Sequence, residues 1–227
     1  MLWVALFLLV VAISFVLAFQ SMRDYSKIPA DLTSEYGVFL IRTKTNFTPA
    51  LLDSIHQDTL KRGLITSIER LFKGMESALV IFGHKSILQN YAEVLNLLEL
   101  EDYTNVDMGA VSLWEVVLKN STKNLFKNLN LLSRTEQLWW QLTLLPASEQ
   151  KGRVKYFQSQ IRVGVYLADK VKRDKLVDSI QNATAEQFVK KPVLFSNDQI
   201  FKFYKQRSFS TDTGNPSLTS TEVIQLS

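Results

Sequence analysis

The chain has 227 residues, 46% of them hydrophobic, which is enough for one or two packed domains. It contains no cysteine, and this excludes disulfide bonds, thiol catalysis and cysteine-ligated zinc sites. The net charge of +4 is unevenly placed: residues 1–113 hold 9 Lys and Arg against 12 Asp and Glu, and residues 114–227 hold 17 against 10. A basic half suits nucleic acid, an anionic membrane surface or an acidic protein partner, and it also suits an ordinary solvated surface.

The first predicted element is an apolar N-terminal helix. Residues 2–19 contain no charged residue, Gly or Pro, and as a helix they would span about 27 Å, close to the hydrocarbon thickness of a bilayer. A cleaved signal peptide is one alternative, because Val16 and Ala18 form a weak cleavage pattern, but no charged segment precedes the apolar core. A buried core helix is the other alternative. We expect residues 1–20 to be an uncleaved transmembrane anchor.

The residues after the anchor predict its orientation. Residues 21–35 are polar and read as a juxtamembrane linker. Arg23 and Lys27 follow the apolar span, and no basic residue precedes it. The positive-inside rule therefore predicts a single-pass protein of the cell membrane with its C-terminal body in the cytoplasm.

Residues 36–106 have the order strand, helix, strand, strand, helix, strand. A helix is expected from Thr48 as N-cap, with Pro49 at its first position, to the vicinity of Gly63. Apolar runs and turn signals place the other elements. These are strands at 38–42, 64–72, 78–82 and 97–103, and a helix at 85–95. This order is the ferredoxin-like, βαββαβ-type pattern.

Residues 107–196 predict a second α+β unit, a copy of the same topology. A strand at 138–145 is expected to stop at Pro146. The remaining elements are strands at 110–119, 157–167 and 193–195, and helices at 125–132 and 170–188. The predicted fold class is therefore α+β, with an N-terminal transmembrane helix followed by two ferredoxin-like units.

Residues 197–227 are predicted to be a helical tail. A short amphipathic helix covers 198–207, and a loop follows. A second helix begins at Thr219, with Glu222 three residues later as in a capping box. The chain ends at Ser227 after about two turns of this helix, so we expect either the end of an expressed segment or a fragment of a longer protein.

A search for catalytic motifs finds no phosphate-binding loop, dinucleotide fingerprint, nucleophile elbow or zinc-protease motif. His56 is predicted to face solvent in the middle of its helix, and His84 to lie in a turn; neither has the partners of a hydrolytic site. The acidic run 99–102 reads as a solvated strand end, with cation binding as the alternative. We expect no catalytic residue, cofactor or metal, although an enzyme with dispersed carboxylates remains an alternative.

Two features are candidates for contact with a partner. Trp139 and Trp140 point to opposite faces of one strand, which favours core or inter-unit packing over base stacking. The second feature is a basic set around the strand at 157–167 and the helix after it. Its candidates for nucleic-acid or anion contact are Lys151, Arg153, Lys155, Arg162, Lys172, Arg173 and Lys175, with Lys170 beside them.

Several segments together resemble a known family. In chain order they are YGVFLIRTKTNFTPALLDSIH, ERLFKGMESALVIFG, LNLLELEDYT, EQLWWQLTLLPA, FQSQIRVGVYLAD and FYKQRSFS. They resemble the membrane-anchored domain that precedes type IV secretion ATPases of the VirB4/HerA-like kind in candidate-phyla (Patescibacteria-type) bacteria. The resemblance covers most of residues 36–227 and rests on pattern and order. It implies that the tail helix leads toward a ring-forming ATP-binding motor, none of whose residues has a matching position in this chain.

These observations predict a non-enzymatic, membrane-anchored assembly or interaction module. The resemblance implies association with a type IV secretion-like, DNA-translocating ATPase encoded elsewhere. The expected partners are the membrane and a protein, either that ATPase or a second copy of the chain. The alternative is a nucleic-acid-binding domain that uses its basic C-terminal half.

Overall fold

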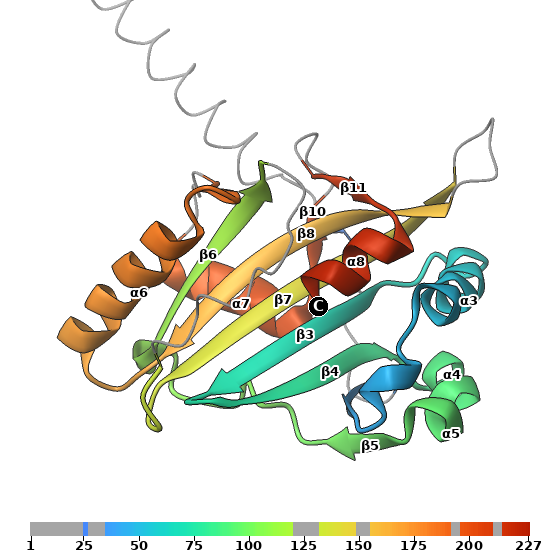
Figure 1. Cartoon of the computed structure of the whole chain (residues 1–227), viewed down its shortest axis with the longest axis horizontal. Helices are drawn as coiled ribbons and strands as arrows, with labels where there is room; N and C mark the ends of the chain where they lie inside the picture. The colour runs from blue at the N-terminus through green and yellow to red at the C-terminus, as the bar shows by residue number, and fades with distance from the viewer. Residues whose placement is uncertain (1–24, 27–34, 120–131, 149–154, 192–195, 211–214) are drawn as a thin grey trace, which may run out of the picture.

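The computed structural model describes residues 25–26, 35–119, 132–148, 155–191, 196–210 and 215–227. The chain has a mixed α+β fold dominated by one antiparallel sheet (Figure 1). The main strands are β2 (Tyr36–Ile41), β3 (Thr66–Lys73), β4 (Glu76–His84), β5 (Leu97–Leu100), β6 (Val111–Leu118), β7 (Gln137–Ser148), β8 (Lys155–Tyr166) and β9 (Phe188–Lys190). The helices are α3 (Pro49–Leu60), α4 (Lys85–Leu88), α5 (Ala92–Leu95), α6 (Lys170–Thr184), α7 (Asn197–Gln206) and α8 (Ser220–Leu226).

The strand order of the sheet is β5-β2-β4-β3-β7-β8-β6-β9, and every neighbouring pair is antiparallel. If strands β2 to β5 are numbered first to fourth along the chain, their order across the sheet is fourth, first, third, second. If strands β6 to β9 are numbered in the same way, their order across the sheet is second, third, first, fourth, which is the order of the first set read backwards. The two sets join where β3 pairs with β7, from Thr66 opposite Leu144 to Lys73 opposite Gln137. The two halves of the chain therefore share one continuous sheet.

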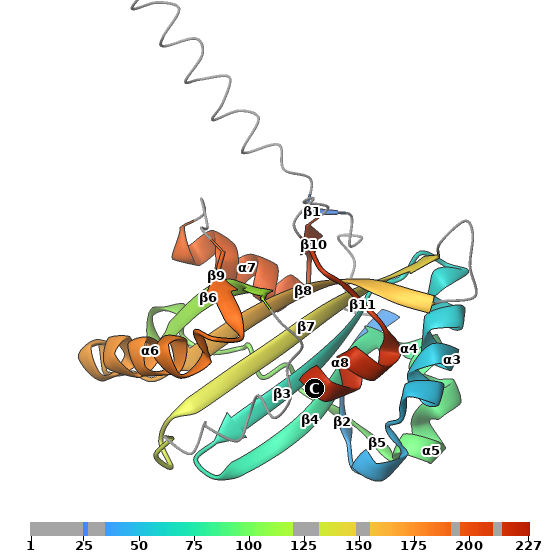
Figure 2. The same ribbon diagram turned by 45° about the horizontal axis from the view of Figure 1, so that its top comes forward.

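The two faces of the sheet are covered by different helices (Figure 2). Helices α3, α6 and α8 pack on one face, where Leu52, Leu176 and Val223 join Ile68 and Leu142 in the largest hydrophobic cluster. Helix α7 lies on the opposite face, and its Phe201 and Tyr204 pack against Trp139. Trp140 points to the first face and contacts Phe188, with ring centroids 5.2 Å apart. Both tryptophans are buried, which confirms the prediction that they belong to the core.

The C-terminal tail contacts both faces of the sheet. After α7, strand β10 (Phe209–Ser210) pairs with β1 (Tyr25–Ser26), and β11 (Ser217–Leu218) pairs with β8 at Gln158 and Phe157. Helix α8 then packs beside α3 on the other face. Its predicted capping box is confirmed, because Thr219 accepts from the Glu222 N–H and Glu222 accepts from the Thr219 N–H. Arg70 Nη1 also donates to the Ser227 carbonyl over 2.9 Å.

Several local predictions hold. Thr48 caps α3 by accepting from the Leu51 N–H, and Pro49 occupies the first helical position. The helix expected at 85–95 is present but interrupted, because a 3₁₀ turn at Gln89–Tyr91 separates α4 from α5. The helix expected at 125–132 falls almost entirely outside the described residues, as do the strand at 193–195 and the apolar segment 2–19. No helix within the described part of the chain is long and apolar enough to cross a membrane.

One strand boundary and one helix boundary were predicted wrongly. Strand β7 continues through Pro146, which lies opposite Phe157 of β8. Its pairing with β3 ends at Leu144, so Pro146 occupies a stretch of β7 with one neighbour fewer, where a residue without an N–H is tolerated. Phe188 was expected at the end of a helix but begins β9, because helix α6 ends at Thr184.

His56 is 1% exposed, so its predicted solvent-facing position is wrong. Its Nε2 lies 3.0 Å from the Ala147 carbonyl and 2.9 Å from the Tyr156 carbonyl, and both of these oxygens can only accept. Nε2 therefore carries the proton. The ring also meets Phe157 edge-on, with centroids 4.8 Å apart. His56 thus fastens α3 to the far end of the β7–β8 pair.

We predict that His56→Ala lowers the free energy of unfolding by about 2–4 kcal/mol, because it opens a cavity and leaves two carbonyls without this donor. Chemical denaturation measures the change. The exposed Gln57 of the same helix provides the matched control, and Gln57→Ala should change stability by less than about 0.5 kcal/mol. Equal effects of the two substitutions would contradict this role of His56.

Candidate functional site

A row of polar side chains crosses four neighbouring strands on the face that α7 covers. Cross-strand pairing places Glu69 of β3 opposite Gln141 of β7, Gln141 opposite Arg162 of β8, and Arg162 opposite Glu115 of β6. Side chains alternate between the faces of a strand, so all four point to the same side. All four are buried. Burial of so many polar groups requires that each finds a partner.

The partners within the row are specific. Gln141 Nε2 donates to Glu69 Oε1 over 3.0 Å, and Arg162 Nη1 donates to Gln141 Oε1 over 3.2 Å. Arg162 Nε donates to Glu115 Oε1 over 3.0 Å, and Gln160 Nε2 donates to the same oxygen over 2.7 Å. The row is therefore a continuous chain of hydrogen bonds across the sheet.

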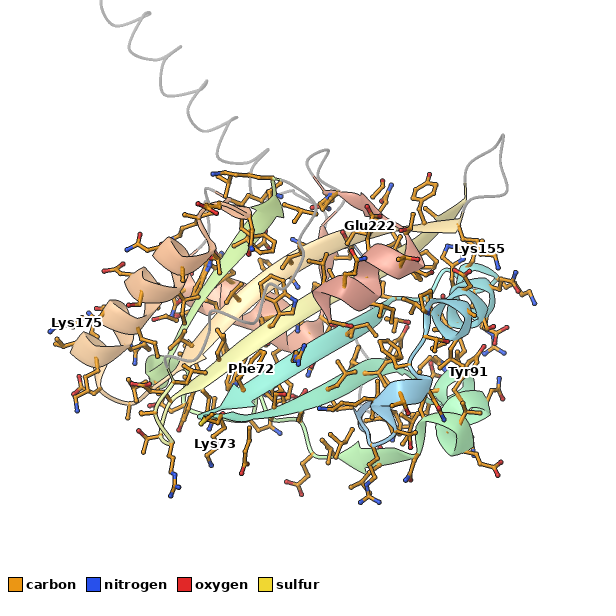
Figure 3. All side chains as sticks on the ribbon, in the orientation of Figure 1. Phe72, Lys73, Tyr91, Lys155, Lys175 and Glu222 are labelled. Carbon is orange, nitrogen blue, oxygen red and sulfur yellow. The ribbon has the colours of Figure 1, made fainter. Side chains whose placement is uncertain are left out.

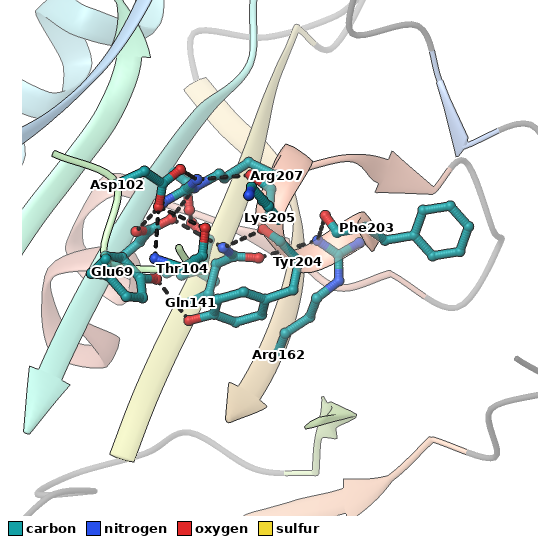
Figure 4. Close-up of polar contacts among 12 residues, drawn as sticks. Glu69, Asp102, Thr104, Gln141, Arg162, Phe203, Tyr204, Lys205 and Arg207 are labelled. Atoms are coloured by element: carbon teal, nitrogen blue, oxygen red, sulfur yellow. Dashed lines mark hydrogen bonds and ion pairs between the residues drawn. The ribbon is translucent and has the colours of Figure 1, made fainter. Parts of the chain in front are cut away.

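The C-terminal end of α7 is bound to this row. Gln141 Nε2 donates to the Tyr204 carbonyl over 3.1 Å, and Arg162 Nη2 donates to the Ser208 carbonyl over 2.6 Å. The carbonyl end of a helix carries partial negative charge, so the Arg162 guanidinium beside the end of α7 is favourable. The Phe203 carbonyl lies 3.5 Å from Arg162 Nη1 (Figure 4).

Arg207 is the central cation of the site. It caps α7 in the left-handed conformation, with φ of 50°, and this turns its side chain back toward the sheet. Its Nε donates to Glu69 Oε1 over 2.9 Å and its Nη2 to Glu69 Oε2 over 3.2 Å, a bidentate ion pair with no exposure of either side chain. Nη1 donates to Asp102, just after β5. The guanidinium also lies 4.7 Å from the Phe82 ring centroid.

The electrostatics of the site shift the pKa values of Arg207, Tyr103 and Tyr204. Burial alone would lower the pKa of Arg207, but the negative charges of Glu69 and Asp102 raise it well above its usual value. Burial and the charge of Glu69 raise the pKa values of Tyr103 and Tyr204, whose hydroxyls lie 2.8 Å apart. The arginine stays charged and the two tyrosines stay neutral near pH 7, so this cluster is suited to holding structure together.

An open cleft of about 430 Å³ lies beside Arg207. It is bounded by the ends of β2 and β5 and by the C-terminal end of α7. Its charged lining combines cations and anions from three elements, and Tyr36 and Phe82 stack on its floor with centroids 5.3 Å apart. The charged residues are Lys85, Lys205, Arg207, Glu99 and Asp102.

The predicted basic set is not one patch. Arg162 is buried in the row, and Arg173 is buried with hydrogen bonds from its guanidinium to Ser112 Oγ and the Leu167 carbonyl. Lys172 and Lys175 are exposed on α6, with Lys172 4.0 Å from Asp169. Figure 3 shows Lys155 and Lys175 at opposite ends of the molecule. Lys151 and Arg153 lie outside the described residues.

The other candidate residues have local partners. His84 caps α4 by accepting from the Ser86 N–H. The acidic run 99–102 is solvated in part, as expected: Glu99 and Glu101 are exposed, and Glu99 pairs with Lys85 over 2.7 Å. Asp102 instead pairs with the buried Arg207. Among the described residues, no group of three or more His, Asp or Glu side chains is arranged to hold a metal ion.

Sequence reasoning missed the buried row and its connection to Arg207. Two polar residues inside apolar strands were the available signal: Glu69 in ITSIERLF and Gln141 in LWWQLTLL. Arg207 had no such signal, because it stands among other polar residues near the tail loop. Comparison of the sequence with models of known protein families and with curated proteins finds no match.

We predict that Arg207→Met lowers the free energy of unfolding by about 3–5 kcal/mol, because it leaves Glu69 charged, buried and without its ion-pair partner. The double variant Arg207→Met with Glu69→Gln should recover part of this loss, since it removes the unpaired charge. The matched control is Lys172→Met, which removes an exposed pair and should cost at most about 1 kcal/mol. A double variant less stable than the single variant would contradict this account.

The free energy of unfolding should depend on pH through Asp102. Burial would raise its pKa, but the charge and hydrogen bonds of Arg207, with those of Thr104, hold it below the ordinary value of 3.8. The unfolded chain then takes up a proton first as the pH falls, so the contribution of Asp102 is complete above its unfolded pKa and is lost as the pH falls through the folded value. We predict that the stability difference between wild type and Asp102→Asn shrinks between about pH 5 and about pH 2. Denaturation at constant ionic strength tests this, and a constant difference would contradict it.

Proposed function

We propose that the chain is a non-enzymatic, membrane-anchored assembly module that holds its α+β body beside a type IV secretion-like, DNA-translocating ATPase. The observation that carries the proposal is the buried network under α7. Its charges are paired with one another and with helix carbonyls, and it fastens the tail to the sheet. Such an arrangement supports a rigid body that presents surfaces to partners, because these ion pairs and hydrogen bonds hold α7 against the sheet.

The topology supports the finer fold proposal of two ferredoxin-like units. The strand order across the first half of the sheet is β5-β2-β4-β3. Along the chain, α3 lies between β2 and β3, and α4 and α5 lie between β4 and β5, which follows the βαββαβ pattern. Strands β6 to β9 repeat that order in reverse along the sheet, with α6 between β8 and β9. On this proposal the units are joined edge to edge through β3 and β7.

Membrane attachment is proposed from the apolar segment 2–19 and the basic residues after it. The ATPase association is proposed from the resemblance of the segments between residues 36 and 227 to the domain that precedes such motors. In this arrangement the tail and its helix α8 face the motor, because the motor follows the corresponding tail in that family.

The test is purification of the full-length chain from its own cells. We predict that it stays in the membrane pellet through high-salt and alkaline washes, enters detergent, and brings with it a protein that binds and hydrolyses ATP. A variant lacking residues 2–19 is the matched control and should leave the pellet. Detergent extraction of the chain with no ATPase bound would overturn the proposed association.

Direct nucleic-acid binding by the basic C-terminal half is the alternative function. Among the seven candidates, Lys155, Lys172 and Lys175 are the described lysines. Lys155 and Lys175 lie at opposite ends of the molecule (Figure 3), and Lys172 is on α6 with Lys175. Phosphate contacts give binding that weakens steeply with salt. Salt-dependent retention of duplex DNA by the same purified chain, reduced by Lys172→Glu and Lys175→Glu together, would favour this alternative.

A further inference from the structure

The two outer strands of the sheet each have one neighbour among the described residues. Strand β5 pairs with β2, and β9 pairs with β6. Within the described part of the chain, each outer strand therefore presents a row of backbone donors and acceptors on its other side, which another strand can pair with. Each also carries an exposed apolar side chain, Leu98 at 39% and Val189 at 46%.

The two edges carry opposite charge. Strand β5 and the residues after it read LLELED, and Glu99 and Glu101 are exposed. Strand β9 and the residue after it read FVKK, and Lys190 is exposed. Glu99 is paired with Lys85, but both side chains of this pair are well exposed, and such a pair exchanges partners at little cost. One edge is therefore acidic and the other basic.

The strand directions allow the edges of two copies to join. All neighbouring strands are antiparallel and six strands lie between the two edge strands, so β5 and β9 run in opposite directions. A second copy placed edge to edge in the same orientation would therefore continue the antiparallel alternation, with α3 and α6 on the same face throughout. The pair formed would be the β5 of one copy and the β9 of the next.

One register matches the side chains on both faces. Glu99 lies opposite Phe39 and Lys190 opposite Val116, and both of these neighbours pack in the cluster under α3 and α6. Glu99 and Lys190 therefore share a face. If they stand opposite each other, antiparallel pairing sets Leu100 opposite Val189 on the other face. Opposite charges and apolar pairs at such positions stabilise a sheet, and like charges oppose it.

We propose that the acidic β5 edge of one copy pairs with the basic β9 edge of another, so that the sheet continues head to tail from copy to copy. This inference rests on the proposed function and names a second copy of the chain as a partner of the assembly module. Pairing of two β5 edges or two β9 edges would bring like charges together. The contact is heterologous, so it builds a closed ring or an open row of copies.

Charge exchange in the full-length chain tests the proposal. In detergent at low salt, sedimentation equilibrium should show wild-type mass rising with concentration. Glu99→Lys alone and Lys190→Glu alone should each weaken association about ten-fold or more, because each places like charges opposite. An equal mixture of the two variants should regain association, since every contact between unlike copies is again complementary. Lys175→Glu, an exposed change on α6, is the matched control and should associate as wild type does.

The absence of cysteine permits a second readout. Opposed residues of an antiparallel pair have Cα atoms about 4.5–5.5 Å apart, which suits a disulfide. The variant carrying both Glu99→Cys and Lys190→Cys should give a ladder of dimers, trimers and larger species on oxidation. Copies with Glu99→Cys alone should remain monomers, and so should copies with Lys190→Cys alone. Efficient dimerisation of either single variant would show like-edge pairing and overturn the proposal.

The outcomes separate this inference from the proposed function. A wild-type chain that stays monomeric at all concentrations, together with a double cysteine variant that gives no ladder, overturns head-to-tail pairing, even where an ATPase co-purifies. A ladder without a bound ATPase supports the pairing and removes only the motor association. Equal association by wild type and both single charge variants also overturns the proposed register.

Discussion

The fold depends on how the buried charge of Arg207 is compensated. A guanidinium removed from water is costly unless carboxylates and carbonyls surround it at close range. Glu69 comes from β3 and Asp102 from the segment after β5, and the arginine itself ends α7. The compensation therefore exists only when the sheet has formed and the tail has docked. This interaction couples residues 138 positions apart in the sequence.

The polar row extends this coupling across the second half of the sheet. Glu69, Gln141, Arg162 and Glu115 lie on four successive strands, and two of them also hold carbonyls at the end of α7. A slip of one residue in any strand would turn its polar member into the cluster on the opposite face. The row thus stabilises one strand register. Because it also binds the C-terminal end of α7, it fixes the position from which the rest of the tail continues.

Local signals were sufficient for most elements of the fold. Thr48 with Pro49, and Thr219 with Glu222, act within a single turn of helix, so the sequence around them contains the whole interaction. His56 and Arg207 could not be placed in this way. The environment of His56 is set by carbonyls about one hundred residues away, and the pairing of Arg207 depends on which strands become neighbours. Such residues read as polar surface until the topology is known.

The sheet topology places the acidic and the basic halves of the sequence at opposite ends of one sheet. Strands β2 to β5 come from the half of the chain with excess acid, and β7 to β9 come from the half with excess base. The β3–β7 junction joins the halves side by side, so the unlike edges β5 and β9 stand as far apart as the sheet allows. In the proposed head-to-tail pairing, a body with such ends would attract further copies in one orientation and repel them in the reverse one. With the proposed membrane anchor, copies would already share a plane, and this orientation preference would select a directional row over random contacts.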